Sequence, residues 1–349
     1  MKKSMKYMAL TGVGLLVAGA LLGLCGFAAG GTPWIYADST GIHVGDTEKR
    51  DFQIREELAA FDALSVNVGL ADVYVVEGDG YAIDIQYTGS FHEPTYSLEE
   101  GVLTIGDQTP SGSSPVWQIL NFNLLGTDGG GSNRIVVTVP ASASLERMEL
   151  YSDMGEIQCA HGAEELVISS SLGEVALRDA QAGKVTVTAD CGSCEIVNLT
   201  ADSLNLTDNL GSAVLHQVNC DAFTADMESG SLTVDDSSLG KVDVENSLGD
   251  VIFDQVSTDG MEIQCENGSM ELTGAFQGIS RLLNNLGDVK VTASLPKDSY
   301  RYEMTLDLGS AYVDGEQVTG GNLFGGSEGA ANRLEVQAEL GSVWLYFPA

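Results

Sequence analysis

The sequence predicts an all-β fold: a single-chain parallel β-solenoid (β-helix) with coils of about 19 residues, preceded by one N-terminal transmembrane helix. The solenoid is indicated by evenly spaced glycines and by alternating apolar residues around them, and the helix by a long uncharged segment after the first lysines. A fixed period of about 20 residues is typical of repeat architectures, in which each unit stacks on the last. The turn glycines, separated by 18 and then by 19 residues, are Gly155, Gly173, Gly192, Gly211, Gly230, Gly249, Gly268 and Gly287.

The residues around each glycine predict strands. The fifth position before it is apolar in every unit, from Leu150 to Leu282, and so is the fourth position after it, from Cys159 to Val291. The positions seven before, one before and two after are also mostly apolar. Apolar residues at every second position line one face of a strand. Each unit is therefore expected to form a strand, a glycine turn, a strand and a second turn, with these positions facing the core.

Stacking must stabilise the units, because one unit buries too few side chains to offset the conformational entropy lost on ordering it. Parallel pairing between successive coils places equivalent residues about 4.8 Å apart, so the regular coils predict a rod roughly 40 Å long. Toward the C-terminus the glycine spacing loosens, with a gap of 22 residues before Gly309 and of 32 before Gly341. Upstream segments that alternate like strands lie at residues 64–68, 73–76, 82–87, 102–105 and 135–139.

The first residues predict a membrane anchor. Lys2, Lys3 and Lys6 precede residues 7–37, which carry no charge. Basic residues before an apolar stretch long enough to cross a bilayer predict a single-pass helix with a cytoplasmic N-terminus, which would place the solenoid outside the cell. A cleaved signal peptide is the alternative reading. The expected organisation is a basic tail (1–6), the transmembrane helix (7–30), a tether (31–58) and the solenoid (59–349), with regular coils at about 145–295 and insertion loops at 106–133 and 315–332.

The chain is strongly acidic, with a formal net charge of −34. Such a surface repels nucleic acid, and we interpret the charge first as a source of solubility. Calcium binding by carboxylates near the turns is a weaker interpretation, since the repeat lacks the glycine- and aspartate-rich nonapeptide of calcium-binding β-rolls. No cofactor is predicted. The weak calcium candidates are Asp153, Glu156, Glu174, Asp250 and Asp288.

The cysteines and possible catalytic groups give little sign of chemistry. Cys191 and Cys194 have CxxC spacing, but they and Cys159 and Cys265 occupy positions that are apolar in other coils. Structural thiols are therefore favoured, and a disulfide between Cys191 and Cys194 stays open. No carboxylate pair stands out as a glycosidase would require, so we predict that the chain is not an enzyme.

One predicted loop carries an apolar island. Residues 106–133 are rich in glycine and serine, yet they contain large apolar side chains. These either fold onto the solenoid as a flap or form a partner-binding patch. The residues of this possible partner-binding loop are Trp117, Ile119, Leu120 and Phe122.

Several segments resemble a known family. The sequence IVVTVP at 135–140, the residues up to Ile157, and VTASLPKDSY at 291–300 leading to Gly309 resemble the bacterial putative-adhesin β-strand-repeat domain, a family of unknown function. The resemblance implies a cell-surface protein attached by an N-terminal helix, without catalytic residues and sometimes associated with envelope stress.

These observations together predict a function in binding. We expect a membrane-anchored, non-catalytic module, adhesin-like or associated with envelope stress, that contacts an unknown protein or a cell-wall or host glycan. The alternatives are a polysaccharide-acting enzyme on a β-helix scaffold and a passive structural spacer.

Overall fold

The computed structural model describes Gly19 and residues 35–38, 41–44, 50–90, 93–107, 133–319 and 322–348. The chain divides into two compact units. The described part of the first includes an antiparallel hairpin of β1 (Ile35–Asp38) and β2 (Gly41–Val44). The second contains nearly all residues of the other strands. No helix among the described residues is long and apolar enough to cross a membrane, and the span expected at residues 7–30 lies outside them apart from Gly19.

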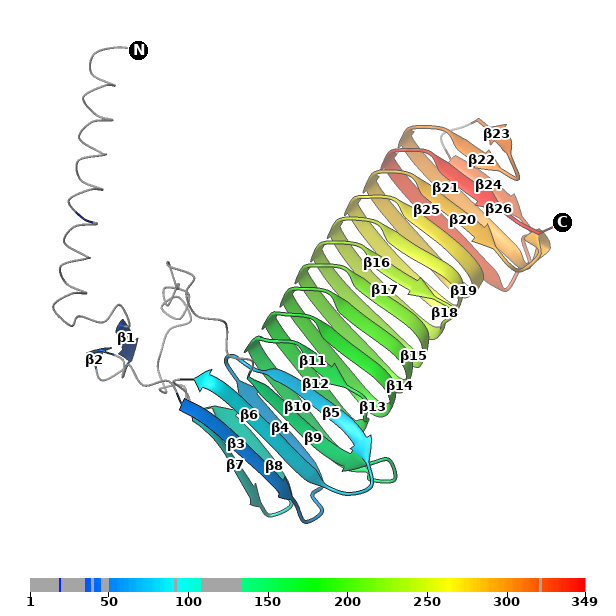
Figure 1. Cartoon of the computed structure of the whole chain (residues 1–349). Helices are drawn as coiled ribbons and strands as arrows, with labels where there is room; N and C mark the ends of the chain where they lie inside the picture. The colour runs from blue at the N-terminus through cyan, green and yellow to red at the C-terminus, as the bar shows by residue number, and fades with distance from the viewer. Residues whose placement is uncertain are drawn as a thin grey trace, which may run out of the picture. The chain divides into compact units, whose positions relative to one another are not determined.

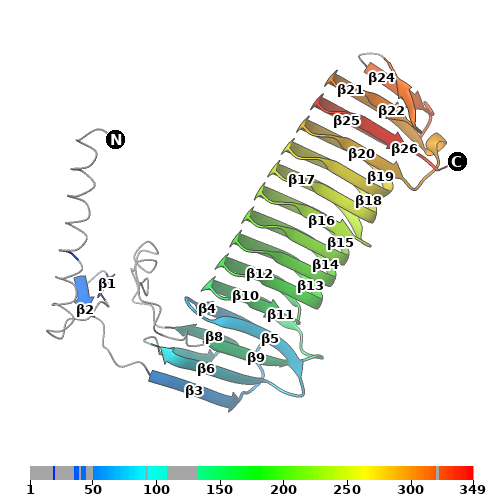
Figure 2. The same cartoon turned by 45° about the horizontal axis from the view of Figure 1, so that its top comes forward.

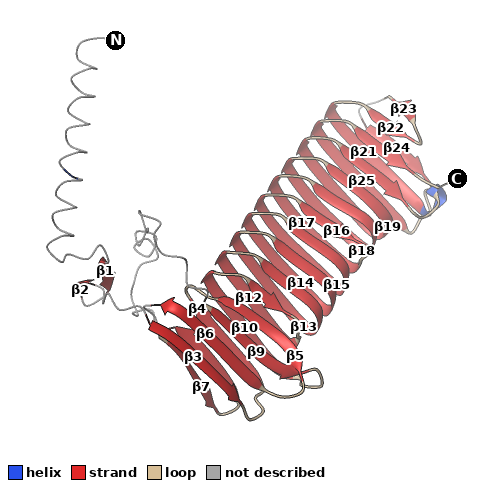
Figure 3. Ribbon diagram, viewed as in Figure 1, coloured by secondary structure: helices blue, strands red, loops and turns tan. Residues whose placement is uncertain are grey.

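The second unit is a parallel β-solenoid, as the sequence predicted (Figures 1 and 3). Its strands β3 to β26, interrupted by one 3-10 turn (Lys297–Ser299), have these bounds in chain order: β3 Arg50–Glu57, β4 Ala63–Val68, β5 Asp72–Gly78, β6 Ala82–Ser90, β7 Pro94–Glu99, β8 Val102–Asp107, β9 Arg134–Pro140, β10 Leu145–Met154, β11 Ile157–Cys159, β12 Ala163–Leu172, β13 Val175–Cys191, β14 Cys194–Leu210, β15 Ala213–Ser229, β16 Leu232–Asp235, β17 Ser238–Leu248, β18 Val251–Asn267, β19 Met270–Leu286, β20 Val289–Ala293, β21 Tyr300–Leu308, β22 Ala311–Val313, β23 Glu316–Val318, β24 Asn322–Gly326, β25 Asn332–Leu340 and β26 Val343–Tyr346.

Each regular coil has three straight segments. The parallel register of β13 on β14 pairs residues 175–178, 180–182 and 184–189 with residues 19 positions later, and it skips Asp179, Gly183 and Asp190. Asp179 has a left-handed φ of 52°, and residues in later coils at the same corner, such as Asn198 and Gln217, have φ of 55°. The coil therefore bends at three places per turn: near the turn glycine, at the left-handed residue, and at a third corner.

The core fills the inside of the coils with stacked rows of apolar side chains. The two rows predicted from the glycine spacing are buried, for example at Leu150 and Ile168 before the glycine and at Leu177 and Ile196 after it. Parallel pairing puts equivalent residues of neighbouring coils directly above one another, so each row is a continuous apolar ladder. The regular coils thus follow the prediction.

At the N-terminal end the stacking order departs from the chain order (Figures 1 and 2). The coil of β4 and β5 pairs in parallel with β10 and β11 on one side and with β8 and β9 on the other. The first coil of the chain therefore lies between two coils that come later in the sequence. Two antiparallel strands, β7 on β8 and β6 on β9, continue the sheet beyond that outer coil.

The C-terminal end repeats this inversion. The last coil of the chain, β25 and β26, lies between β19 and β20 on one side and β21 and β22 on the other. β24 pairs antiparallel with β21, and β23 with β22. Residues 315–332, predicted as an insertion loop, therefore include two strands, because the outermost coil would otherwise expose unpaired backbone groups along its edge.

The predicted tether also contains a strand. β3 pairs with β6, and an ion pair between Arg55 and Asp84 joins them. Phe52, Ile54 and Leu58 pack against the core. The folded unit thus begins near Phe52, not at residue 59.

Candidate binding surface

The turn glycines form one row along the stack because a Cβ would not fit at their positions. A Cβ added at Gly230 would overlap the carbonyl oxygen of Gly211, and the glycines from Gly173 to Gly287 each meet the preceding turn glycine in the same way, whereas Gly155 meets the carbonyl oxygen of Ala71. The row continues from Gly287 to Gly341 and from Gly341 to Gly309, so it follows the stacking order and not the chain order. The even spacing in the sequence therefore records a close approach of backbones in successive coils.

Inside this corner lies a row of partly polar residues, which we call the inner row. Ser152 Oγ donates a hydrogen bond to the carbonyl oxygen of Ala71 at 3.0 Å, and Asn284 Nδ2 donates to that of Gly268 at 3.0 Å. Asn246 Nδ2 does the same to Gly230 at 3.3 Å. These side chains satisfy carbonyls that point into the corner. The inner row, three positions before each glycine, is Ser152, Ser170, Ala189, Asp208, Met227, Asn246, Cys265 and Asn284.

Unlike these side chains, and like that of Ser170, the side chain of Asp208 has no hydrogen-bond partner. Its side chain is fully buried, and neither carboxyl oxygen has a hydrogen-bond partner. Its neighbours in register are Ala189 and Met227, which are apolar. Burial raises the pKa of Asp208 to about 6, because a low-dielectric environment disfavours the charged form. Only the protonated carboxyl can donate a hydrogen bond, as the asparagines of this row do.

Outside the same corner lies a row of exposed apolar side chains, the outer row, one position before each glycine. Its large apolar members are between 41% (Met154) and 66% (Leu308) exposed. Three polar or small residues interrupt them. In stacking order the outer row is Leu70, Met154, Leu172, Cys191, Leu210, Ser229, Leu248, Asn267, Leu286, Leu340 and Leu308.

The outer row corrects the sequence prediction, which counted the position before the glycine among the core positions. In a straight strand, the side chain one position before the glycine would point inward, as the alternating core residues do. The chain bends at the glycine, however, and this bend turns the side chain to solvent. No signal in the sequence separates this row from the buried inner row, because polar and apolar residues are mixed in both.

Carboxylates flank the outer row on both sides. One flanking row lies one position before the outer row in the sequence, and the other lies two positions after it. Neither flanking row contains Lys, Arg or His. Most of these acidic side chains are exposed. The flanking carboxylates are Asp153, Asp190, Glu228, Glu266, Glu339 and Asp307 on one side and Asp72, Glu156, Glu174, Asp250 and Asp288 on the other.

The calcium candidates all belong to these flanking rows, and two of them have a structural role. Asp250 Oδ1 accepts the backbone N–H of Ser269 at 2.8 Å, and Asp288 Oδ1 accepts that of Ser342 at 2.9 Å. Serine side chains serve the same purpose in other coils. In these coils the acid or serine after the glycine thus satisfies a corner N–H of the next coil, whether or not an ion binds.

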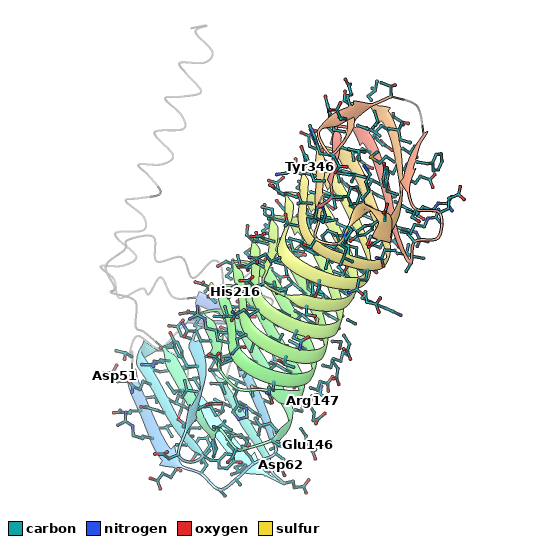
Figure 4. All side chains as sticks on the ribbon, turned by 90° about the vertical axis from the view of Figure 1, so that its right-hand side faces the viewer. Asp51, Asp62, Glu146, Arg147, His216 and Tyr346 are labelled. Carbon is teal, nitrogen blue, oxygen red and sulfur yellow. The ribbon has the colours of Figure 1, made fainter. Side chains whose placement is uncertain are left out.

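The described residues place one cluster of potential metal ligands elsewhere, at the left-handed corner. His216, Asp235 and Asp236 present ligand atoms within 4.8 Å of one another. His216 Nδ1 lies 2.7 Å from Asp235 Oδ2, and the two residues are register neighbours in β15 and β16. Figure 4 labels His216 on the central coils. A surface His–Asp pair of this kind also forms without any ion, as an ordinary hydrogen bond.

The cysteines of the described region are free thiols. Cys194 faces the core, whereas Cys191 belongs to the outer row and is partly exposed, contrary to the core position predicted for it. Burial raises the pKa of Cys159 to about 12 and that of Cys265 to about 11, so these thiols stay protonated. They act as small apolar side chains.

A depression near the third corner offers no evident chemistry. It encloses about 640 Å³ and is lined by Glu77, Glu164 and His161 among others. His161 is buried, and its ring nitrogens lie 2.8 Å and 3.2 Å from the carbonyl oxygens of Gly162 and Pro140. The imidazole is thereby engaged with the backbone.

An aromatic patch lies on the outer face at the C-terminal end. Tyr312 and Trp344 stack with ring centroids 5.5 Å apart and planes 6° apart. Tyr346, which Figure 4 labels, and Lys290 adjoin Trp344 around a depression of about 330 Å³. Stacked aromatic rings on a β-surface present flat apolar faces, which suit both proteins and sugar rings.

The predicted partner-binding loop leaves the solenoid beside the outer row. Asp107 accepts the backbone N–H of Gly69 at 3.0 Å, and Asn133 Nδ2 donates to the carbonyl oxygen of Leu70 at 2.8 Å. Residues 108–132 between them, which include Trp117 and the other apolar residues named above, lie outside the described residues.

Comparisons with known structures show distant likeness. An adhesin named as putative from Bacteroides fragilis is 10% identical, covers 85% of this chain and 98% of its own, and has a TM-score of 0.39. One from Parabacteroides distasonis is 11% identical, covers 85% and 98%, and has a TM-score of 0.40. A protein from the same species named as a putative lipid binding protein is 13% identical, covers 86% and 98%, and also has a TM-score of 0.40. Likeness at this level says nothing about what this chain binds.

The sequence itself identifies the family. No curated protein matches the chain. The profile of the family described as Toastrack DUF4097 matches residues 61–207 and again residues 195–345, so its two matches together span most of the chain. This confirms the resemblance inferred from residues 135–157 and 291–309: the chain belongs to the Toastrack DUF4097 family, a domain family of unknown function.

Proposed function

We propose that this chain is a membrane-anchored extracellular solenoid that works as a non-catalytic, adhesin-like binding module, with the outer row as its contact surface. The supporting observation is the exposure of large apolar side chains along the glycine corner. Ser229 and Asn267 occupy the same row in well-formed coils, so the fold does not require leucine there. Contiguous apolar side chains kept in solvent are typical of interaction surfaces.

The anchor in this proposal is the apolar segment at residues 7–30 with the three lysines before it. With the N-terminus in the cytoplasm, the solenoid would extend from the outer face of the cell membrane, where an envelope-stress role would also require it. Labelling of a single added surface cysteine, for instance at Ser257, with a membrane-impermeant reagent on intact cells tests this placement. Labelling only after lysis would overturn it.

A glycan is the second candidate ligand, and the aromatic patch favours it. Trp344, Tyr312 and Tyr346 offer ring faces, while Glu271, Asp288 and Lys290 supply polar groups around the same depression. Sugar recognition commonly combines these two features. In that case the two surfaces would serve different ligands.

The two classes of ligand are separable in one experiment. The full-length chain, inserted in phosphatidylcholine nanodiscs, is tested against defined peptides and purified cell-wall glycans. An outer-row variant (Leu210→Ser, Leu248→Ser, Leu286→Ser) and a patch variant (Trp344→Ala) are tested in parallel. Loss of binding in either variant supports a binding function at that surface. Binding that neither variant alters, or turnover of a glycan, would overturn the proposal in favour of a spacer or an enzyme.

A further inference from the structure

We propose that the outer row is a docking surface for a cationic amphipathic helix, that is, a helical segment of a partner protein with an apolar stripe bordered by Lys and Arg. The inference rests on the proposed function and adds the chemistry of the partner. Three features of the described residues support it: the spacing of the leucines, the gaps between them, and the charge on both sides.

The spacing of the row fits a helix laid along it. In the central coils, large apolar residues occur in every second coil, at Leu210, Leu248 and Leu286. Two coils rise about 9.6 Å. Two turns of an α-helix rise about 10.8 Å, so the apolar stripe of a helix stays close to this repeat over several turns. The two ladders therefore drift by only about 1 Å per repeat, which side-chain flexibility absorbs.

The gaps in the row give the helix places to insert side chains. Between the central leucines stand Ser229 and Asn267, and Cys191 stands between Leu172 and Leu210. Because Ser229 and Cys191 have shorter side chains than the leucines beside them, we expect hollows between the leucines and not a flat stripe. Apolar side chains of a helix that enter such hollows bury more area than they would on a flat surface.

Charge selects among possible occupants of the row. Its flanks carry carboxylates such as Glu228, Glu266 and Asp250, and neither flank carries a basic residue. A second copy docked row to row would oppose carboxylates to carboxylates, and an anionic lipid surface or a nucleic acid would be repelled in the same way. Lys and Arg beside the apolar stripe of a helix would meet the carboxylates on both sides.

The expected electrostatic contribution is mainly in rate and selectivity. Glu228 and Glu266 are exposed, so each ion pair with them adds little to the affinity. Several pairs together, in the field of a chain with net charge −34, steer a cation to the row and weaken with salt. The apolar contact is expected to supply most of the affinity.

The experiment uses the full-length chain in phosphatidylcholine nanodiscs, with empty nanodiscs subtracted, and three fluorescent 18-residue peptides. The first is a Leu/Lys peptide with an apolar stripe at helical spacing, the second replaces each Lys with Glu, and the third scrambles the first so that no stripe forms. Anisotropy is read at low and moderate salt. We expect the first peptide alone to bind, with an affinity that falls as salt rises.

Variants then place the peptide on the row. The triple substitution Leu210→Ser, Leu248→Ser and Leu286→Ser should weaken binding by roughly tenfold or more, as expected for loss of buried apolar contacts. A matched control, Val214→Ser with Ile279→Ser, removes exposed apolar side chains outside the row and should leave binding unchanged. Glu228→Gln with Glu266→Gln should reduce the salt dependence. Thermal melting checks that each variant is folded.

The outcomes separate this inference from the proposed function. If the Leu/Glu peptide binds as well as the Leu/Lys peptide and the triple variant abolishes both, the row binds without charge selection, so this inference fails and the proposed function stands. If the scrambled peptide binds equally and the triple variant has no effect, the attraction is ionic adsorption, which also overturns the inference. If no probe of any class responds to the outer-row or patch variants, both fail.

Discussion

At the glycine corner the buried side is partly polar and the exposed side is largely apolar, which is the reverse of what a soluble protein usually shows. The inner row, sealed in the coils, holds serine, asparagine and Asp208, while the outer row, in solvent, holds leucine. Several inner side chains have partners that explain them, since Asn246 and Asn284 hydrogen-bond to corner carbonyls. The fold does not require leucine in the outer row, since Ser229 and Asn267 occupy the same row in other coils. The contrast teaches that polarity at this corner follows backbone hydrogen bonding inside, while the proposed contact with a partner would account for the leucines outside.

The corner itself is the first place to break this arrangement. Gly230→Ala introduces a Cβ that overlaps the carbonyl oxygen of Gly211, at a φ of +147°. We expect a loss of about 3 kcal/mol or more in the free energy of unfolding, because strain and overpacking add. Gly80→Ala is the matched control, since nothing lies within 4 Å of its added Cβ. Urea denaturation of both variants measures the difference, and equal stabilities would show that the close approach is unimportant.

Asp208 makes the inner row sensitive to pH. Its pKa is raised to about 6 from 3.8, so the folded state binds the proton more tightly than the unfolded state. The group favours folding fully below about pH 4, and this advantage is lost as the pH rises through 6. The free energy of unfolding should therefore fall by up to about 3 kcal/mol between pH 4 and pH 7.5 from this residue.

Asp208→Asn should remove that pH dependence and raise stability at pH 7.5. An asparagine here has an amide that donates without a proton to gain, as Asn246 and Asn284 do in their coils. Chemical denaturation of wild type and variant across pH 4 to 8 gives the two profiles. Parallel profiles would mean that Asp208 does not titrate as its burial indicates.

The asparagines test the inner row from the other direction. Asn284→Ala leaves the carbonyl oxygen of Gly268 without its donor inside the coil. The expected cost is about 1–3 kcal/mol, typical of a buried polar group left unpaired. Asn284→Ser, with the side chain that Ser152 uses for the same bond, should recover part of it. If alanine and serine are equally stable, the hydrogen bond contributes nothing measurable.

The smallest effect on stability is expected on the outer row. Leu248→Ser places there the residue that the chain itself carries at Ser229. Because Leu248 is half exposed, the free energy of unfolding should change by no more than about 0.5 kcal/mol. A destabilisation of 2 kcal/mol or more in urea titration would mean that the row is structural, and the contrast between the two sides would disappear.

The sequence was sufficient to predict the coil but not its corners in detail. Period-two alternation identifies residues such as Ile168 and Leu177 as core, because burial imposes it. Leu172 follows the same parity yet faces solvent, because the bend at Gly173 is a property of three-dimensional stacking that periodicity does not encode.

For the two ends of the solenoid, the sequence predicted irregular coils but not the order in which they stack. A signature such as that around Gly341 shows that a segment occupies the glycine corner, but it carries no information on which coil lies next to it. Neighbouring coils present almost the same apolar ladders, so their order is chosen by the caps and connections. That is why residues 315–332 were predicted as a loop although Glu316–Val318 and Asn322–Gly326 form two strands of the cap.

The inverted order of the last coils has a consequence for synthesis. β21 and β22 leave the ribosome before β25 and β26, on which they rest in the folded chain. The strip from β10 to β20 can assemble coil by coil as it emerges, but the final pair must wait for the last residues, and β19 keeps an open edge until then. A chain that stops before residue 332 is therefore expected to present that edge to any passing strand, which makes complete translation a condition for a closed, non-aggregating molecule.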